Sequence, residues 1–156
     1  MLLSIQEMNK EYINKIVKWR YESPYDFYNN EASEEIIQEF LEGEYYVLLN
    51  ERNQIFGYYC LGISAQVPAG NEKDVYLEEG IDMGLGMNPD FVGKGNGLEF
   101  CQWILNDIYK RSPDAMIRLT VATFNQRAIH LYKKLGFVEK DKFQATTVEF
   151  MTMVKE

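Results

Sequence analysis

The chain has 156 residues, a formal net charge of −8 and an apolar fraction of 46%. A chain of this length is expected to form a single domain over residues 1–156 around one hydrophobic core. The negative charge argues against a nucleic-acid partner and against binding to an anionic membrane surface. It favours a cationic ligand such as an amine, although many soluble proteins are acidic for solubility alone.

Cysteine usage and the absence of targeting signals predict a cytoplasmic protein. No apolar run approaches the roughly 18 residues of a membrane-spanning helix, and no signal peptide is evident at the N-terminus. Cys60 and Cys101 both lie in apolar segments, which is typical of buried free thiols in a reducing compartment. No cluster of Cys, His and carboxylate residues has the spacing of a metal site, so we expect no metal cofactor.

Hydrophobic periodicity predicts the elements of the first half of the chain. The predicted elements are a strand at 2–7, a helix at 9–18, a helix from its cap Ser33 to Gly43, and strands at 45–49 and 55–61. The last two strands are joined by four polar residues and are expected to form an antiparallel hairpin. The following segment, 67–74, contains Pro68 and Gly70 and is expected to be a loop.

The second half of the chain alternates between strand and helix patterns. The predicted elements are a long strand at 75–87, a helix that follows the glycine loop with Leu98 on its buried face and stops at 111–113, a strand at 117–121, a helix from Asn125 to Gly136, and final strands at 137–139 and 143–154. Gly84 and Gly86 interrupt the long strand, which indicates a bulge or a close approach by another group. The whole order, β-α-α-β-β-β-α-β-α-β-β, predicts an α/β (α+β) fold.

Glycines recur at every second position from Gly93 to Gly97, after the long strand and before a helix. Backbone N–H groups at such a helix start, together with the helix dipole, make a natural anion site, and a diphosphate is the expected ligand. Lys94 is followed by glycine, so the segment is not a Walker loop, and Leu98 replaces the third glycine of a dinucleotide fingerprint. An ordinary glycine-rich turn is the alternative.

A second motif, Asn-x-x-Ala-x-x-Leu-Tyr-x-x-x-Gly-Phe, spans residues 125–137 and reads as a helix with a cap at each end. Taken together, the two segments resemble the GNAT superfamily of acyl-CoA-dependent N-acyltransferases. The first family signature, Arg/Gln-x-x-Gly-x-Gly/Ala, is matched at Gly95 and Gly97 but has Val92 in its leading position. The second signature is matched throughout, so the pair is far more specific than either segment alone.

The resemblance implies the GNAT fold, in which a mixed central sheet of about seven strands, flanked by about four helices, splays open between its fourth and fifth strands. It also implies acetyl-CoA as the donor and a primary amine as the acceptor. The loop amides would then bind the diphosphate, and the end of the long strand would bind the pantetheine amides and polarise the thioester carbonyl. The implied CoA-binding residues are Leu85, Gly86, Met87, Val92, Gly93, Lys94, Gly95, Asn96, Gly97, Asn125 and Tyr132.

Two side chains are candidates for proton transfer. Tyr132 matches the general-acid tyrosine of the family, which would protonate the leaving thiolate. The alternative is that Tyr132 only packs on its helix face. Asp82 is a candidate base, although a charged strand end is usually just solvated and a relay through water would serve equally well. His130, the only histidine, is expected on the surface.

The segment 19–28 is unusually aromatic for a connection between two helices. In the GNAT family this region lines the acceptor site, so Trp19, Tyr25 and Tyr28 are candidate substrate-binding residues for a cationic or amphipathic amine. The alternative is a loop whose aromatic residues anchor it to the sheet. A small-molecule amine is slightly favoured over a peptide N-terminus.

Two other classes of function stay open. The replacement of Arg or Gln by Val92 suits a binding module that keeps CoA as a ligand but has little catalytic activity, and a nucleotide-binding regulator is a third class. The sequence leaves open the identity of the amine, the length of the acyl chain, the general base and the oligomeric state. A homodimer formed through the long final strand is one option.

Overall fold

The computed structural model describes residues 1–156, and its strands form one seven-stranded sheet. The strands are β1 (Ser4–Glu7), β2 (Glu44–Leu49), β3 (Ile55–Leu61), β4 (Ile81–Met87), β5 (Ile117–Ala122), β6 (Val138–Ala145) and β7 (Val148–Lys155). Their order across the sheet is β1-β2-β3-β4-β5-β7-β6. The β4–β5 pair is parallel, whereas the pairs at both ends of the sheet are antiparallel. The predicted α/β fold with a mixed seven-stranded sheet is confirmed.

The chain divides into two compact units. The first unit comprises Met1–Cys60 and Leu85–Gly97, and the second comprises Leu61–Gly84 and Leu98–Glu156. The boundary falls inside β4, so the first residues of this strand belong to the second unit and the last ones to the first. No helix is both long and apolar enough to span a membrane.

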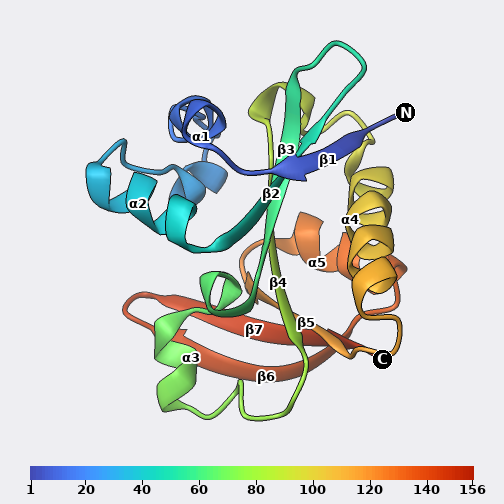
Figure 1. The fold of residues 1–156 in the computed structure, drawn as a ribbon. Coiled ribbons are helices and arrows are strands. Elements are labelled where there is room, and N and C mark those ends of the chain that lie inside the picture. The colour runs from blue at the N-terminus through green and yellow to red at the C-terminus, as the bar shows by residue number, and fades with distance from the viewer. The chain divides into compact units, whose positions relative to one another are not determined.

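In the first unit, helices α1 (Lys10–Ile16) and α2 (Glu34–Glu42) lie side by side (Figure 1). Each helix begins at a side-chain cap, because Asn9 accepts a hydrogen bond from the backbone N–H of Tyr12 and Ser33 accepts one from that of Ile36. A single 3₁₀ turn follows α1 in the chain. The buried apolar residues of these two helices are Ile13, Ile16 and Phe40.

In the second unit, helix α4 (Gly97–Arg111), whose first residue belongs to the other unit, provides the longest apolar face. Its buried residues are Phe100, Cys101, Ile104, Leu105 and Ile108. Helix α5 (Gln126–Lys134) follows β5, and the short helix α3 (Pro68–Glu72) contacts β6 of the C-terminal hairpin (Figure 1). Both cysteines are buried and form no disulfide, as predicted.

The pairing between β4 and β5 covers only three residue pairs, which are Ile81–Ile117, Asp82–Arg118 and Met83–Leu119. Both strands continue beyond these pairs without pairing to each other. The interruption between the fourth and fifth strands, implied by the family resemblance, is therefore present in the register. It leaves the C-terminal half of β4 without a ladder partner on β5.

Two predictions for the segment before β4 are wrong. Residues 68–72 form α3 instead of a loop, because Pro68 occupies the first helical turn, where its missing N–H costs nothing. The strand predicted at 75–87 starts only at Ile81. The Tyr76 hydroxyl instead accepts a hydrogen bond from the Val67 N–H at 2.9 Å and bonds the Thr120 hydroxyl at 2.7 Å. Side-chain anchoring thus replaces a sheet ladder at the start of this segment.

The predicted boundary between the last two strands is also displaced. Residues 140–142 lie between the two predicted strands, but β6 runs through them with a register shift between Glu139 and Lys142. The turn lies instead at Thr146, which has a φ of 55°. The final strand β7 has β5 on one side and β6 on the other, so it is not a free edge for a homodimer contact. The edge strand of this unit is β6.

Candidate active site

The chain between β4 and the glycine-rich segment is attached to the neighbouring strand β3. After β4 the chain makes a 3₁₀ turn at Pro89–Phe91, and the Asn88 side-chain amide just before it donates a hydrogen bond to the Ile55 carbonyl at 2.8 Å. Phe91 stacks on Phe56 of β3, with 4.7 Å between the ring centroids. The start of the loop is thus held to the neighbouring strand by one polar and one aromatic contact.

Gly93 and Gly95 determine the shape of the loop, with φ values of 76° and 79° that other residues adopt only with strain. A Cβ at either position would meet nothing within 4 Å, so backbone conformation alone requires glycine. The N–H groups of residues 93–96 donate to no group of the protein. Amides in this state, close to the start of a helix and beside the exposed Lys94, are suited to an anionic ligand.

The end of β4 carries two contacts that the sequence did not predict. The ring of Tyr58 lies directly against Gly86, since a Cβ added there would be 2.5 Å from the ring carbon Cε1. The hydroxyl of Tyr21 donates a hydrogen bond to the carbonyl of Met87 at 2.7 Å. Glycine is therefore required at position 86 by packing alone. The predicted CoA-binding segment Leu85–Met87 is partly exposed along its whole length.

Tyr58 is the centre of an aromatic group in the first unit. Its ring centroid lies 6.1 Å from those of Trp19 and Tyr45 and 5.6 Å from that of Phe40. Phe40 and Tyr45 are buried, whereas Trp19, Tyr21 and Tyr58 are partly exposed. Burial raises the pKa values of Tyr21 and Tyr58 above the usual range of tyrosine, so both phenols are protonated at neutral pH.

The other two predicted acceptor residues, Tyr25 and Tyr28, are the ends of the 3₁₀ turn Tyr25–Tyr28. Tyr28 packs edge-to-face on Phe27, with 5.1 Å between the ring centroids. The Asn29 side chain closes this segment by accepting the backbone N–H of Tyr21 at 2.8 Å. Of the three aromatic residues chosen from the sequence, Trp19 belongs to the ring group around Tyr58.

In the second unit, the motif at 125–137 forms α5 with a cap at each end. The Asn125 side chain accepts a hydrogen bond from the Ala128 N–H at 3.1 Å, as predicted for an N-cap. Gly136, beyond the end of the helix, has a φ of 98°, and a Cβ there would lie 2.8 Å from the Lys155 side-chain nitrogen. His130 is exposed, as predicted.

The candidate general acid Tyr132 lies on the buried face of α5, where it is 8% exposed. Its ring packs edge-to-face on Phe137, the last residue of the motif, with 6.0 Å between the centroids. Phe137 is itself almost fully buried. The family motif therefore has a structural explanation at its C-terminal end, since Phe137 supports the Tyr132 ring.

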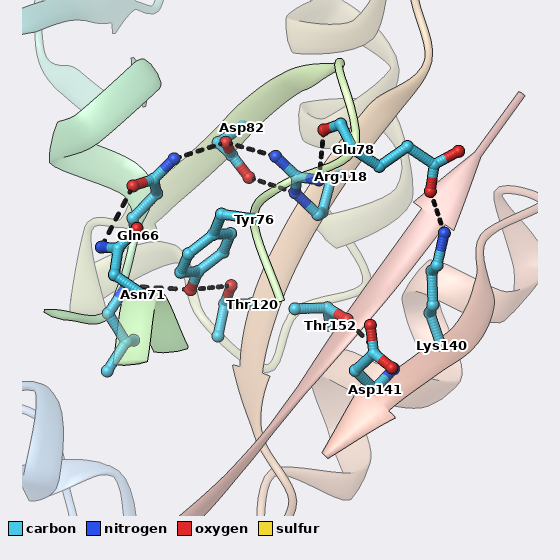
Figure 2. A network of polar contacts seen from close by, with 11 residues as sticks. Gln66, Asn71, Tyr76, Glu78, Asp82, Arg118, Thr120, Lys140, Asp141 and Thr152 are labelled. Atoms are coloured by element: carbon cyan, nitrogen blue, oxygen red, sulfur yellow. Dashed lines mark hydrogen bonds and ion pairs between the residues drawn. The ribbon is translucent and has the colours of Figure 1, made fainter. Parts of the chain in front are cut away.

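The candidate base Asp82 belongs to a buried polar network (Figure 2). Its two carboxylate oxygens accept hydrogen bonds from Nε and Nη2 of Arg118 at 2.6 and 2.9 Å, and Oδ2 also accepts the Gln66 side-chain amide at 2.8 Å. Asp82 is 5% exposed and Arg118 is 2% exposed. These contacts are those of a bidentate ion pair that holds the strands together, and they do not favour a role for Asp82 as the base.

The network continues from Arg118 to the segment before β4. A third guanidinium nitrogen donates to the Glu78 carbonyl at 2.9 Å, and the guanidinium lies 5.2 Å from the centre of the Tyr76 ring. Hydrogen bonding to Asp82 raises the pKa of Arg118, so the guanidinium stays charged. Figure 2 also shows the ion pair between Glu78 and Lys140 at the surface of the same unit.

The family model for GNAT acetyltransferases matches residues 13–137. The chain belongs to the GNAT family. Among curated protein sequences no match was found. The described residues contain no group of three or more His, Cys, Asp and Glu side chains placed to hold a metal ion.

Several solved structures share the GNAT fold with this chain. Mutant forms of the spermidine/spermine N-acetyltransferase SpeG from Vibrio cholerae are 18% identical, with a TM-score of 0.69 over 99% of this chain and 94% of theirs. A chimera of that enzyme with hSSAT is 19% identical, with a TM-score of 0.69 over 99% and 95%. The dodecameric Vibrio cholerae spermidine N-acetyltransferase is 18% identical, with a TM-score of 0.68 over 98% and 92%. At these identities the likeness establishes the fold and leaves the substrate open.

Replacing Asp82 by Asn tests whether the ion pair is structural. The variant leaves the Arg118 charge buried without its counter-charge, so we expect the free energy of unfolding to fall by about 3 kcal/mol in urea denaturation. The control is Glu11→Gln, which breaks an exposed pair with Lys15 at 4.0 Å and should cost less than about 0.5 kcal/mol. A change at Asp82 as small as that of the control would contradict the structural role.

Proposed function

We propose that this protein is an N-acetyltransferase whose single domain, residues 1–156, transfers the acetyl group of acetyl-CoA to a primary amine. The observation that carries the proposal is the set of N–H groups at residues 93–96, which donate to no group of the protein and precede α4. A diphosphate offers the acceptor oxygens that these amides need. Membership of the GNAT family supports acetyl-CoA as the source of that diphosphate.

The proposed reaction is a direct attack. The amine nitrogen forms a bond with the thioester carbonyl carbon, and the bond between that carbon and sulfur breaks. The Tyr132 hydroxyl gives its proton to the sulfur, the proton lost by the amine passes to water, and water returns a proton to the Tyr132 oxygen. The N–H of Gly86 is a candidate donor to the carbonyl oxygen as negative charge develops on it. Asn125, in addition to capping α5, is a candidate contact for pantetheine.

The loop fits CoA without the usual polar side chain of the family. Val92 takes the position of Arg or Gln in the family signature, so the diphosphate is held by backbone donors and by the charge of Lys94 alone. This arrangement is sufficient in principle because glycine permits close approach of the backbone to an anion. The affinity for CoA is expected to be lower than in relatives that keep the side chain.

A small-molecule amine is the favoured acceptor. The net charge of −8 attracts a cationic substrate, and the partly exposed aromatic residue Trp19 offers a face for an ammonium group. The structural neighbours named above act on spermidine, so polyamines belong among the first amines to be tested. Tyr25 and Tyr28 stay candidate substrate residues in this proposal.

A catalytically weak CoA-binding module is the second candidate. The observation that favours it is the engagement of both Asp82 oxygens by Arg118 and Gln66, which leaves the reaction without an assigned base. Measurement of CoA and acetyl-CoA binding by calorimetry comes first, because both candidates require it. Micromolar binding supports the donor site, and a folded sample that binds neither compound contradicts both candidates.

Release of free thiol with a panel of amines separates the enzyme from the binding module. Turnover that depends on both acetyl-CoA and an amine supports the enzyme. For Tyr132→Phe we expect the turnover number to fall by about a hundredfold or more, because a general acid contributes typically 10²–10⁴ in rate. The dissociation constant for CoA should change little, since the ring that packs on Phe137 is kept. An unchanged rate would remove Tyr132 from the mechanism.

Replacing Gly95 by Val tests the loop. A Cβ at this position would project from backbone that approaches the diphosphate, and the φ of 79° adds strain. We expect CoA affinity to fall by at least about tenfold in calorimetry. The control is Gly62→Val, at a glycine with a φ of 76° and equally open surroundings, which reproduces the strain away from the loop. Equal CoA affinities in the two variants would refute the assignment of the loop.

A further inference from the structure

The hydroxyl of Tyr58 has no explanation in the fold. Its ring is packed among Trp19, Phe40 and Tyr45, where a phenylalanine would make the same contacts. The hydroxyl makes no hydrogen bond within the protein, and no buried polar atom lacks a partner, so the oxygen reaches solvent. A hydroxyl that faces solvent and bonds no group of the protein is available to a ligand as both donor and acceptor.

The position of this hydroxyl connects it to the end of β4. A Cβ built on Gly86 would lie 2.8 Å from the Tyr58 oxygen, so the oxygen lies beside the open side of Gly86. The Tyr21 hydroxyl donates a hydrogen bond to the carbonyl of the next residue, Met87, at 2.7 Å. Phenol groups from two distant parts of the chain therefore lie at the last residues of one strand.

The chemistry of the two phenols suits an amine. Tyr21 uses its proton on the Met87 carbonyl, so its oxygen lone pairs can accept a hydrogen bond, and Tyr58 has both its proton and its lone pairs available. Burial is the main cause that raises the pKa of Tyr58, and the negative charge of the Glu39 carboxylate on α2 acts in the same direction. An ammonium or amine nitrogen supplies several N–H donors and is attracted by the face of Trp19.

We propose that the Tyr58 hydroxyl, together with the Tyr21 hydroxyl, binds the nitrogen of the acceptor amine beside Gly86. This inference rests on the proposed function, because Gly86 is the residue whose N–H would polarise the thioester carbonyl. The two tyrosines are positioning residues: they orient the nitrogen and take no proton from it. The ligand class is a primary amine, whose hydrogens can be shared between two oxygens.

The decisive variant is Tyr58→Phe, which removes an oxygen that no group of the protein uses. With spermidine, tyramine and a peptide with a free N-terminus as probes, we expect KM for the amine that is acetylated to rise about tenfold. The dissociation constant for acetyl-CoA and the melting temperature should stay unchanged. A merely structural role would move the last two and leave KM alone. The matched control is Tyr12→Phe, which removes the hydroxyl bonded to Gln6 in the same unit.

Tyr21→Phe provides a second arm, in which KM for the amine should rise by a similar factor. Unchanged KM in both variants, with an active wild-type protein, would overturn the inference while the proposed function stands. A wild-type protein that binds acetyl-CoA but neither binds nor acetylates any of the three amines would also overturn it. If acetyl-CoA does not bind, the proposed function fails, and calorimetric amine binding that is lost in Tyr58→Phe would still support the inference.

Discussion

The ion pair between Asp82 and Arg118 is the interaction on which the second unit depends. The two residues are direct partners in the β4–β5 register, one position before the pairing stops at Met83. A parallel pair of only three residues is weak by itself, and a buried bidentate pair at its middle resists separation of the strands. The guanidinium also holds the Glu78 carbonyl, so the same charge fixes the strand and the chain that leads into it. The strand end that the proposed chemistry uses therefore begins directly after a rigid attachment.

Much of the fold was predictable because it depends on local signals. The caps at Ser33 and Asn125, the hairpin of β2 and β3 and the helix after Gly97 all follow from residues within a few positions of one another. The segment at 75–80 could not be predicted in the same way. Its strand-like composition is overridden by the Tyr76 hydroxyl, whose partner Thr120 is 44 positions away. Contacts of that range leave no periodic trace in a single sequence.

In the candidate site, backbone features could be predicted from the sequence but side-chain contacts could not. The glycine spacing predicts the positive φ of Gly93 and Gly95, and the α5 motif forms as expected. Tyr58 occupies an ordinary strand position, and only the structure shows its ring against Gly86. Asp82 was predicted as a candidate base because it is a carboxylate on the strand. Its partner Arg118 is 36 positions away in the sequence, so a local pattern could not predict the ion pair. Gly86 was predicted to approach a ligand, but the Tyr58 ring that packs against it is enough to explain why glycine is required there.

The placement of β7 between β5 and β6 has a consequence for how the protein is made. During synthesis from the N-terminus, β5 and β6 emerge before the strand that joins them. Until residues 148–155 leave the ribosome, β5 exposes one open edge and β6 has no ladder at all. The nascent second unit therefore keeps its apolar strands unpaired until β7 has emerged. Truncation within β7 would remove an interior strand of the sheet and expose new edges on both β5 and β6.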